Sequence, residues 1–313
     1  MRALEQEVRP ASPYRLPRGS DDRTLRVVGG VATRLLHVEG SPVFVRAWQP
    51  AADRLVLRAQ PLDPASVIQP IAATAEPTPA GPAQLERAIE RMRFVLGVDY
   101  DLGEFHRRFR RDPLVGPLIR RFPGFRPRRR VWPWEALAAA VVGQLIEAQR
   151  AVTIERRIVG RWGPRLGEGR EAPRDVPAAA TIAGRAPAEL AAMDLAPTRA
   201  AALRRVALAV ASGRCRLDSP AAERRLLAIP QIGPWTVQCL GLFGHGDMDS
   251  LPAGDLGYIK LVGRLAGLGR RADVAEVEDF YAPYEPYRGL VGALTLAGLH
   301  RTVAQGPPLR IAA

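Results

Sequence analysis

The sequence predicts a mainly helical α+β protein, in which a small N-terminal antiparallel sheet precedes a larger multi-helical body. Residues 25–71 contain short apolar or alternating runs rich in Val, Leu and Phe, separated by Gly, Pro and Asp, which is typical of strands and turns. After residue 83, apolar residues recur at helical spacing almost to the end of the chain. With 313 residues, 47% of them hydrophobic, the chain is long enough for two or three domains.

The N-terminal part divides into an arm, a sheet region and a linker. Residues 1–22 mix Glu, Arg, Pro and Ser, so we expect a flexible arm there. The β-rich domain and its linker then extend over residues 23–82, and the linker, 72–82, is rich in Pro, Ala and Thr. Residues 83–313 form the helical region.

Individual helices are predicted along the helical region. Residues 85–96 place apolar side chains close to one face of a helix. Residues 134–163 are a long helix-forming run that fits either one helix or two. Further helices are expected at residues 189–193, 199–212, 221–228, 235–243, 255–266, 274–281 and 289–303.

The charge of the chain favours an anionic partner. The formal net charge is +13 and the isoelectric point is about 11.0, and nucleic acid is the commonest partner of so basic a protein. Lys260 is the only lysine, and Ala, Gly, Pro and Arg are all abundant, so a GC-rich coding sequence is an alternative explanation. An arginine-rich run with interleaved aromatics, residues 106–130, fits either a DNA-facing rim or a solvated helix face.

Several classes of protein are disfavoured. Cys215 and Cys239 form no C-x-x-C motif, which argues against a disulfide framework and an iron–sulfur cluster. No His/Cys/Asp cluster indicates a transition metal. No apolar run is long enough to span a bilayer, and residues 1–23 lack the apolar core of a signal peptide. We therefore expect a cytoplasmic protein without a membrane partner.

The most informative segment is AERRLLAIPQIGPWTVQCLGLFG, residues 222–244. A helix ends near residue 228, a tight turn follows, and Pro234 occupies a favourable first-turn position of a second helix. Such a turn leaves backbone N–H groups pointing outward, where they can bind a phosphate, and a side chain at Gly233 would hinder the approach of a DNA backbone. An ordinary corner between helices is the alternative. The segment resembles the helix-hairpin-helix pattern, apolar-Pro-Gly-apolar-Gly-x-x-Thr, at every position except Gln231. That resemblance implies DNA binding without sequence specificity, through Gln231, Ile232, Gly233, Pro234 and Thr236.

An aspartate follows the hairpin by some twenty residues, in LPAGDLGYIKLVGRLAG. Asp255 directly precedes a helical pattern, so taken alone it predicts a helix N-cap. Hairpin, spacer and aspartate in this order resemble the HhH-GPD superfamily of base-excision DNA glycosylases. The resemblance implies two helical subdomains with the active-site cleft between them, and it makes Asp255 the catalytic carboxylate. A fixed carboxylate would stabilise positive charge on the sugar and orient or deprotonate the attacking water.

The residue two positions after the second hairpin glycine separates two branches of this superfamily. Members that also cut the strand have a lysine there, whereas this chain has Trp235 and so offers no amine for a Schiff base. The sequence therefore resembles the monofunctional 3-methyladenine DNA glycosylase II (AlkA) type, in which IGxWT is usual. The implied function is flipping and hydrolytic excision of damaged bases, alkylated purines above all, from duplex DNA in base-excision repair.

Two further segments support the resemblance. VVGQLIEAQRA is similar to a family segment whose residue after the first Gln wedges into the minor groove; the matching residues are Gln144 and Leu145. YEPYRGLVGALTLAG places Tyr287 where the family has a pocket Trp, and Arg288 matches. Trp235, Tyr287 and Arg288 are the implied substrate pocket, in which an aromatic face can stack on a cationic base. Packing in the core is the alternative for both Leu145 and Tyr287.

The chain also departs from the family pattern. Gln231 replaces the first hairpin glycine, Cys239 and Leu256 stand where pocket aromatics are common, and Glu147 and Ala148 replace the usual Ser-Val. These departures leave two alternative functions open: a non-catalytic lesion-sensing protein, and a glycosylase for oxidised or deaminated bases.

The remaining expectations concern what the protein binds. The resemblance implies no cofactor apart from a Na+ or K+ ion, held by the backbone carbonyls of Leu227, Ile229 and Ile232. The expected partner is duplex DNA with damaged bases, bound by a monomer associated with the nucleoid.

Overall fold

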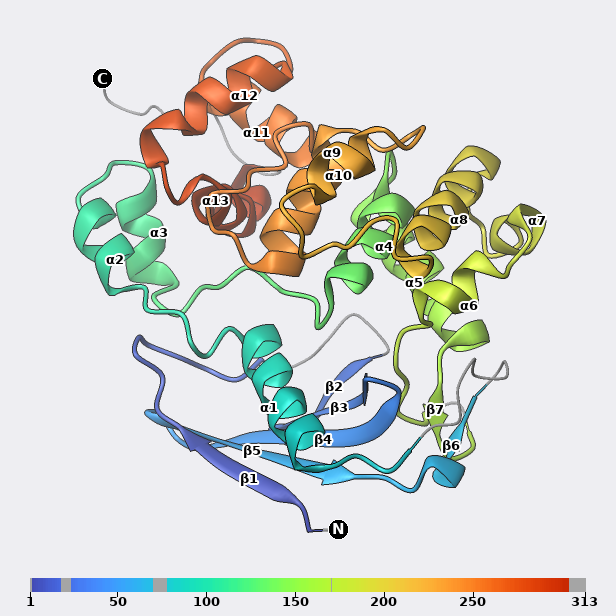
Figure 1. The fold of residues 1–313 in the computed structure, drawn as a ribbon. Helices are drawn as coiled ribbons and strands as arrows, with labels where there is room; N and C mark the ends of the chain where they lie inside the picture. The colour runs from blue at the N-terminus through green and yellow to red at the C-terminus, as the bar shows by residue number, and fades with distance from the viewer. Residues whose placement is uncertain (1, 18–23, 70–77, 170, 304–313) are drawn as a thin grey trace.

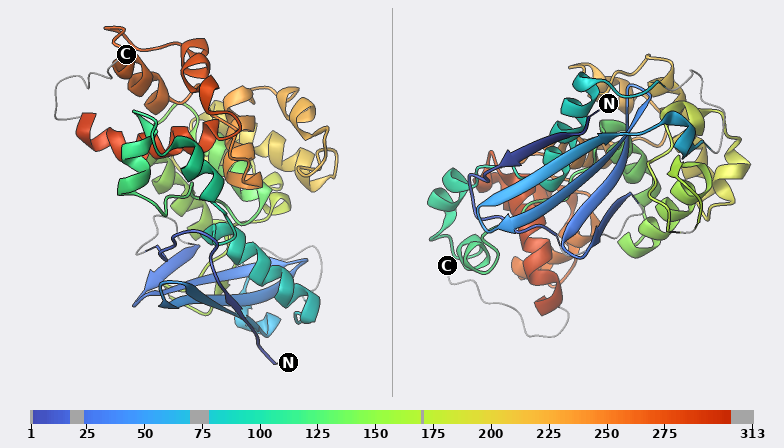
Figure 2. Two further views of the ribbon diagram at one scale, coloured as in Figure 1. Left: turned by 90° about the vertical axis from the view of Figure 1, so that its left-hand side faces the viewer. Right: turned by 90° about the horizontal axis from the view of Figure 1, so that it is seen from below.

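The computed structural model describes residues 2–17, 24–69, 78–169 and 171–303. It has a five-stranded antiparallel sheet at one end and a body of helices at the other, as Figure 1 and Figure 2 show. The predicted fold class is thereby confirmed. The predicted linker falls largely on residues 70–77, which lie outside the described residues.

The sheet has the strand order β1-β5-β4-β3-β2, so β2 to β5 form an up-and-down meander. Apolar residues of the inner face alternate with exposed polar ones along β5, as expected for a sheet covered on one side. The strands are β1 (Leu4–Val8), β2 (Leu25–Val28), β3 (Val31–Val38), β4 (Ser41–Ala51) and β5 (Arg54–Pro61).

The predicted flexible arm is wrong for the part that the structure describes. Residues 4–8 form β1, which pairs with β5 from Leu4 opposite Ala59 to Val8 opposite Leu55. Tyr14 and Leu16 are also buried against the sheet. Residues 4–8 form a strand because β5 would otherwise expose an edge of unpaired N–H and C=O groups. The two strands are about fifty residues apart in the sequence, so no local pattern predicts their pairing.

Helix α1 (Pro82–Leu96) lies across the sheet (Figure 1). Pro82 begins it, and Gly97 ends it with a φ of 65°. Its buried face, Leu85, Ile89 and Met92, shares one hydrophobic core with the inner face of the sheet. The first helix after the predicted boundary at residue 82 thus packs with the sheet and not with the helical body.

Two hydrophobic cores organise the helical body. One joins α4 (Pro133–Gly143) and α5 (Ala148–Trp162), the two helices of the long run, to the helices within residues 179–227. The other joins the helices within residues 103–121 to those within residues 256–303. The remaining elements are α2 (Gly103–Phe109), α3 (Val115–Arg121), α6 (Ala179–Ala183), α7 (Pro187–Ala191), α8 (Pro197–Ala211), α9 (Ala222–Leu227), α10 (Pro234–Cys239), a π-helix (Leu240–His245), α11 (Leu256–Leu265), α12 (Val274–Tyr281) and α13 (Arg288–Val303). Short 3-10 turns at Pro64–Ser66 and Ala282–Tyr284 and the small ladder β6 (Val67–Ile68) with β7 (Arg165–Leu166) complete the fold.

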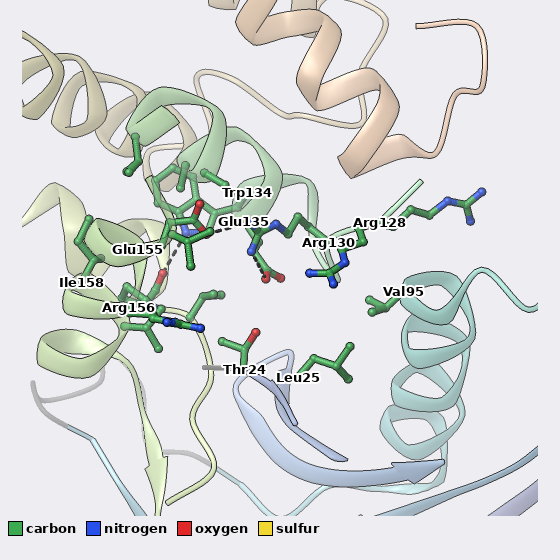
Figure 3. A pocket seen from close by; sticks show the side chains of 18 of the residues that line it. Thr24, Leu25, Val95, Arg128, Arg130, Trp134, Glu135, Glu155, Arg156 and Ile158 are labelled. Atoms are coloured by element: carbon green, nitrogen blue, oxygen red, sulfur yellow. Dashed lines mark hydrogen bonds and ion pairs between the residues drawn. The ribbon is translucent and has the colours of Figure 1, made fainter. Parts of the chain in front are cut away.

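Buried charges join the sheet to the helical body. Arg34 of β3 pairs with Glu135 of α4 at 2.8 Å, and both side chains are at most 2% exposed. Arg130 lies 3.6 Å from the same Glu135 and pairs with Glu155 at 2.8 Å. A cavity of about 180 Å³ lies beside this network (Figure 3), and its lining contains none of the site residues predicted from the sequence.

Candidate active site

The predicted hairpin is present as α9, a turn over residues 228–233, and α10. The turn is closed by backbone hydrogen bonds, from Ile229 N to Leu226 O and from Ile232 N to Ile229 O at 3.0 Å. Gln231 has a φ of 74°, in the left-handed region that favours glycine. The turn therefore has, at Gln231, a backbone conformation that glycine adopts more easily than glutamine.

The turn offers backbone donors to the outside. Among the described residues, the amides of Gly233 and Trp235 donate to no acceptor, whereas Thr236 N donates to Gly233 O at 3.0 Å. Gly233 has extended backbone, with φ −115° and ψ 179°, and a Cβ added there would meet no atom within 4 Å. Neither the backbone conformation nor the packing inside the protein requires glycine at this position. Only a molecule bound to the turn would require it.

The side chains of the predicted DNA-binding residues differ in their accessibility. Gln231 and Pro234 are exposed, but Ile232 is 5% and Thr236 1% exposed. The side chain of Thr236 therefore does not face solvent, and its assignment as a DNA-binding residue stays a prediction. Its hydroxyl lies inside the protein because α10 packs this face against α4.

Gln144 connects residues 141–151, the wedge segment that carries Leu145, to the hairpin. Its Nε2 donates to Gln231 O at 2.8 Å and to Thr236 Oγ1 at 2.9 Å. Leu145 follows it, is 103% exposed, and has a φ of 57°. The alternative that Leu145 is a core residue is wrong, because α4 ends at Gly143 and the chain turns outward before α5 begins.

Asp255 is the N-cap of α11, and its Oδ1 accepts a hydrogen bond from Gly257 N at 2.7 Å. The carboxylate is partly exposed, and buried groups face it from the hairpin helix and from α11. Burial raises the pKa of Cys239 and of Tyr258 well above their ordinary values, and the negative charge of Asp255 raises both further. Both groups therefore stay protonated and add no charge beside Asp255.

Trp235 brings the wedge segment, the hairpin and Asp255 together. A Cβ added to Gly143 would lie 3.8 Å from Trp235 Cη2, and one added to Gly254 would lie 3.7 Å from Trp235 Cβ. Gly143, at the end of α4, and Gly254, just before Asp255, thus both lie beside Trp235. Its Nε1 is buried and donates to no acceptor in the described part of the chain.

Tyr287 belongs to an aromatic cluster on α2 and the turn before α13. Its ring centroid lies 5.4 Å from that of Phe105 and 6.2 Å from that of Phe109, and the side chain is partly exposed. Burial raises the pKa of Tyr287, and the neighbouring carboxylate of Glu104 raises it further. The phenol is therefore neutral and presents an uncharged aromatic face.

Arg288 supports the loop that leads to Asp255. Its Nε donates to Asp249 Oδ1 at 2.9 Å, its guanidinium also pairs with Asp249 Oδ2, and its own amide donates to the same carboxylate at 3.1 Å. Its guanidinium fixes the start of α13 against residues 247–250.

Sequence reasoning missed the partners of these residues. Phe105 and Phe109 hold Tyr287, and Asp249 holds Arg288. The i, i+4 spacing of the two phenylalanines in FHRRF was a signal for one helix face, but nothing in the sequence connected that face to residues 180 positions away.

The arginine-rich run divides between two roles. Arg126 donates to the carbonyls of Gly97, Pro13 and Gly124, and Arg129 lies over the ring of Tyr100, 3.4 Å from its centroid. These arginines stabilise the chain at the C-terminal end of α1. Those left exposed on and near α2 and α3 are Arg107, Arg108, Arg110, Arg111, Arg120 and Arg121.

Two further properties of the described residues bear on function. No group of three or more His, Cys, Asp or Glu among them could hold a metal ion. Within the same residues, no helix is both long and apolar enough to cross a membrane.

No family model matches the chain. Among curated proteins, it is 28% identical over 229 residues to a probable bifunctional transcriptional activator/DNA repair enzyme AlkA of Mycobacterium tuberculosis, covering 72% of this chain and 45% of that protein. It is 24% identical to a DNA-3-methyladenine glycosylase of Bacillus subtilis, covering 61% of this chain and 65% of that one. The matched segment thus spans about half to two thirds of the length of these relatives.

Solved structures show the fold. The 3-methyladenine DNA-glycosylase of Archaeoglobus fulgidus superposes with a TM-score of 0.73 at 19% identity, covering 95% of this chain and 98% of that one. An 8-oxoguanine glycosylase/lyase of Clostridium acetobutylicum, solved with double-stranded DNA, superposes with a TM-score of 0.68 at 13% identity, covering 96% and 98%. The chain shares the fold of these two DNA glycosylases. Its resemblance to the AlkA type, stated above from its motifs, is confirmed by the named relatives.

Proposed function

We propose that the chain is a monofunctional DNA glycosylase that flips damaged bases, alkylated purines above all, out of duplex DNA and removes them by hydrolysis. The observation that carries the proposal is the position of Asp255. It is a partly exposed carboxylate held at a helix start. Gly254, the residue before it, and Gly143, at the end of α4, both lie beside Trp235 of the hairpin helix.

Binding begins at the hairpin. The amides of Gly233 and Trp235 donate to a phosphate of the lesion strand, and the exposed turn lets the backbone approach. Leu145 enters the minor groove and fills the gap left by the extruded base, which offsets part of the unstacking cost.

Excision uses charge stabilisation. An N7- or N3-alkylated purine already carries positive charge, so it leaves as a neutral base with the electrons of the glycosidic bond. The sugar becomes cationic, and the carboxylate of Asp255 stabilises that charge. A water molecule then adds to C1′ and loses its proton to Asp255 or to solvent, which leaves an intact abasic strand.

The pocket and the hairpin supply supporting interactions. The uncharged faces of Trp235 and Tyr287 stack on a cationic base. The carbonyls of Leu227, Ile229 and Ile232 are the ligands proposed for a monovalent cation; of these, Ile229 O accepts one hydrogen bond among the described residues and keeps a lone pair. Such an ion would add positive charge at the phosphate. The protein acts on DNA as a monomer associated with the nucleoid.

An excision assay on duplexes that carry a panel of alkylated, oxidised and deaminated bases tests the proposal. Release of alkylated purines by the wild type and not by Asp255→Asn supports it. Binding of lesion duplexes without release of any base would instead identify a lesion-sensing protein.

A further inference from the structure

The side-chain amide of Gln144 bridges two segments that are far apart in the sequence. It joins the end of α4 to Gln231 and Thr236, which lie 87 and 92 residues further on. A carbonyl oxygen only accepts hydrogen bonds, so the atom 2.8 Å from Gln231 O must be the amide nitrogen. Both hydrogens of Nε2 are therefore used inside the protein, and neither is available to a base or a phosphate.

The groups that this amide holds are conformationally unusual. The described chain has four non-glycine residues with positive φ, and two of them, Leu145 and Gln231, adjoin the Gln144 amide. The left-handed region is unfavourable for a residue with a Cβ, so it persists only where surrounding contacts maintain it. Gln144 directly precedes Leu145 in the sequence, and its side chain donates a hydrogen bond to the carbonyl of Gln231.

The second acceptor is rigid. Thr236 lies in the first turn of α10, is 1% exposed, and its hydroxyl points at the wedge segment and not at solvent. Two residues before Gln144, Val142 O accepts a hydrogen bond from Arg199 of α8 at 2.9 Å, which fixes the last turn of α4. The segment that carries Leu145 is thus attached to α8 at its start and to the hairpin through Gln144.

We propose that Gln144 is a positioning residue that couples the Leu145 wedge to the hairpin. The proposal rests on the proposed function, because it takes Leu145 as the group inserted into DNA. When the hairpin binds a phosphate, the bridge holds Leu145 at a fixed height and angle to that phosphate. Lesion recognition by the wedge and backbone binding by the hairpin then form one event, and Gln144 contributes without touching DNA.

A double-mutant cycle tests the coupling. Gln144→Met keeps the length of the side chain and removes its donors, and it is combined with Leu145→Ala. The measured quantity is the ratio of affinities for a duplex with a tetrahydrofuran abasic analogue and for the undamaged duplex. Gln144→Met should lower this ratio about tenfold, the value of one to two hydrogen bonds. In the Leu145→Ala background it should lower it less than about twofold. If the fold-changes in the affinity ratio caused by the two single substitutions simply multiply in the double variant, the proposal is overturned.

A second variant removes the acceptor instead of the donor. Thr236→Val keeps the side-chain shape, and its buried position cannot contact DNA. It should reproduce the fall caused by Gln144→Met. If it leaves the ratio unchanged while Gln144→Met lowers it, then Gln144 contacts DNA directly and the positioning role is wrong. Gln60→Met, on the exposed face of β5, is the matched control.

This design separates the inference from the proposed function. The abasic analogue has no base to excise, so the cycle is independent of catalysis. A general folding defect lowers the affinity for both duplexes and the melting temperature, and so leaves the ratio unmoved. Additive effects in an enzyme that excises bases overturn the role of Gln144 alone, whereas a wild type that excises none of the lesions overturns the proposed function.

Discussion

The carboxylate of Asp255 caps α11 by accepting a hydrogen bond from the backbone amide of Gly257, with 2.7 Å between Oδ1 and N. The proposed catalytic group is therefore also part of the helix start, and its orientation is fixed before any substrate arrives. A substitution that removes both the cap hydrogen bond and the negative charge cannot separate their effects. One that keeps the cap hydrogen bond measures the effect of the charge alone.

Asp255→Asn is expected to abolish excision while the fold and lesion binding persist. Asn is as good an N-cap as Asp, so its oxygen still accepts from Gly257, but the negative charge that stabilises the cationic sugar is lost. We expect single-turnover excision to fall at least about 100-fold, within the range seen when one electrostatic contact to a transition state is removed. Asp255→Ala should in addition lose about 1 kcal/mol of stability with the cap. Unchanged excision by the Asn variant would reject the catalytic assignment.

The protein is expected to leave the abasic strand uncut and to form no covalent adduct. Trp235 occupies the position of the lyase lysine, and the only lysine, Lys260, is on the exposed face of α11. Borohydride added during turnover should trap no protein–DNA complex. A trapped complex that disappears in Lys260→Arg would show that this lysine serves as the nucleophile.

Leu145→Ala should weaken lesion binding without reducing stability. A fully exposed side chain leaves no cavity when truncated, so the melting temperature should stay constant, whereas a buried leucine would cost about 2–5 kcal/mol. The affinity for lesion duplex should fall, because the gap in the base stack is no longer filled. Val28→Ala, 67% exposed on the sheet, is the control. A lower melting temperature with normal affinity would contradict the wedge assignment.

Gln231→Gly is expected to stabilise the protein by about 0.5–1 kcal/mol. Its φ of 74° is strained for a residue with a Cβ and unstrained for glycine. The bridge to Gln144 should survive, because the acceptor is the backbone carbonyl of this residue. Chemical denaturation measures the effect, and Gln231→Val, which is β-branched, should destabilise instead. Equal stability of the Gly and Val variants would show that the turn is not strained.

Glu135→Gln is expected to destabilise the protein by about 3–5 kcal/mol, because it leaves the buried Arg34 without its charged partner. The double variant Arg34→Met/Glu135→Leu should recover part of that loss, since neither charge of the buried pair remains, although Arg130 also loses its contact with Glu135. The exposed pair Arg87–Glu90 gives the comparison: Glu90→Gln should cost less than about 1 kcal/mol. If Glu135→Gln and Glu90→Gln lower the free energy of unfolding by similar amounts, then breaking the buried Arg34–Glu135 pair costs no more than breaking an exposed pair.

Local patterns predicted most of the secondary-structure elements and the local backbone features of the candidate site well. Apolar spacing located α1, α8 and α13 to within a few residues, because helical periodicity is a property of neighbouring side chains. The turn at residues 229–233 and the cap at Asp255 were equally predictable, since both depend on residues within one or two helical turns.

Contacts between distant segments were not predictable. The strand at residues 4–8 forms only because β5 offers it an edge, and Thr236 is buried only because α4 covers it. The choice between wedge and core for Leu145 likewise depended on where α4 ends and which partner Gln144 finds 87 residues later. The sequence by itself determined the helices, the hairpin and the aspartate, because each is encoded by neighbours along the chain. The tertiary structure alone decided which of these residues meet, because burial and long-range hydrogen bonds depend on packing between elements and leave no periodic signal in the sequence.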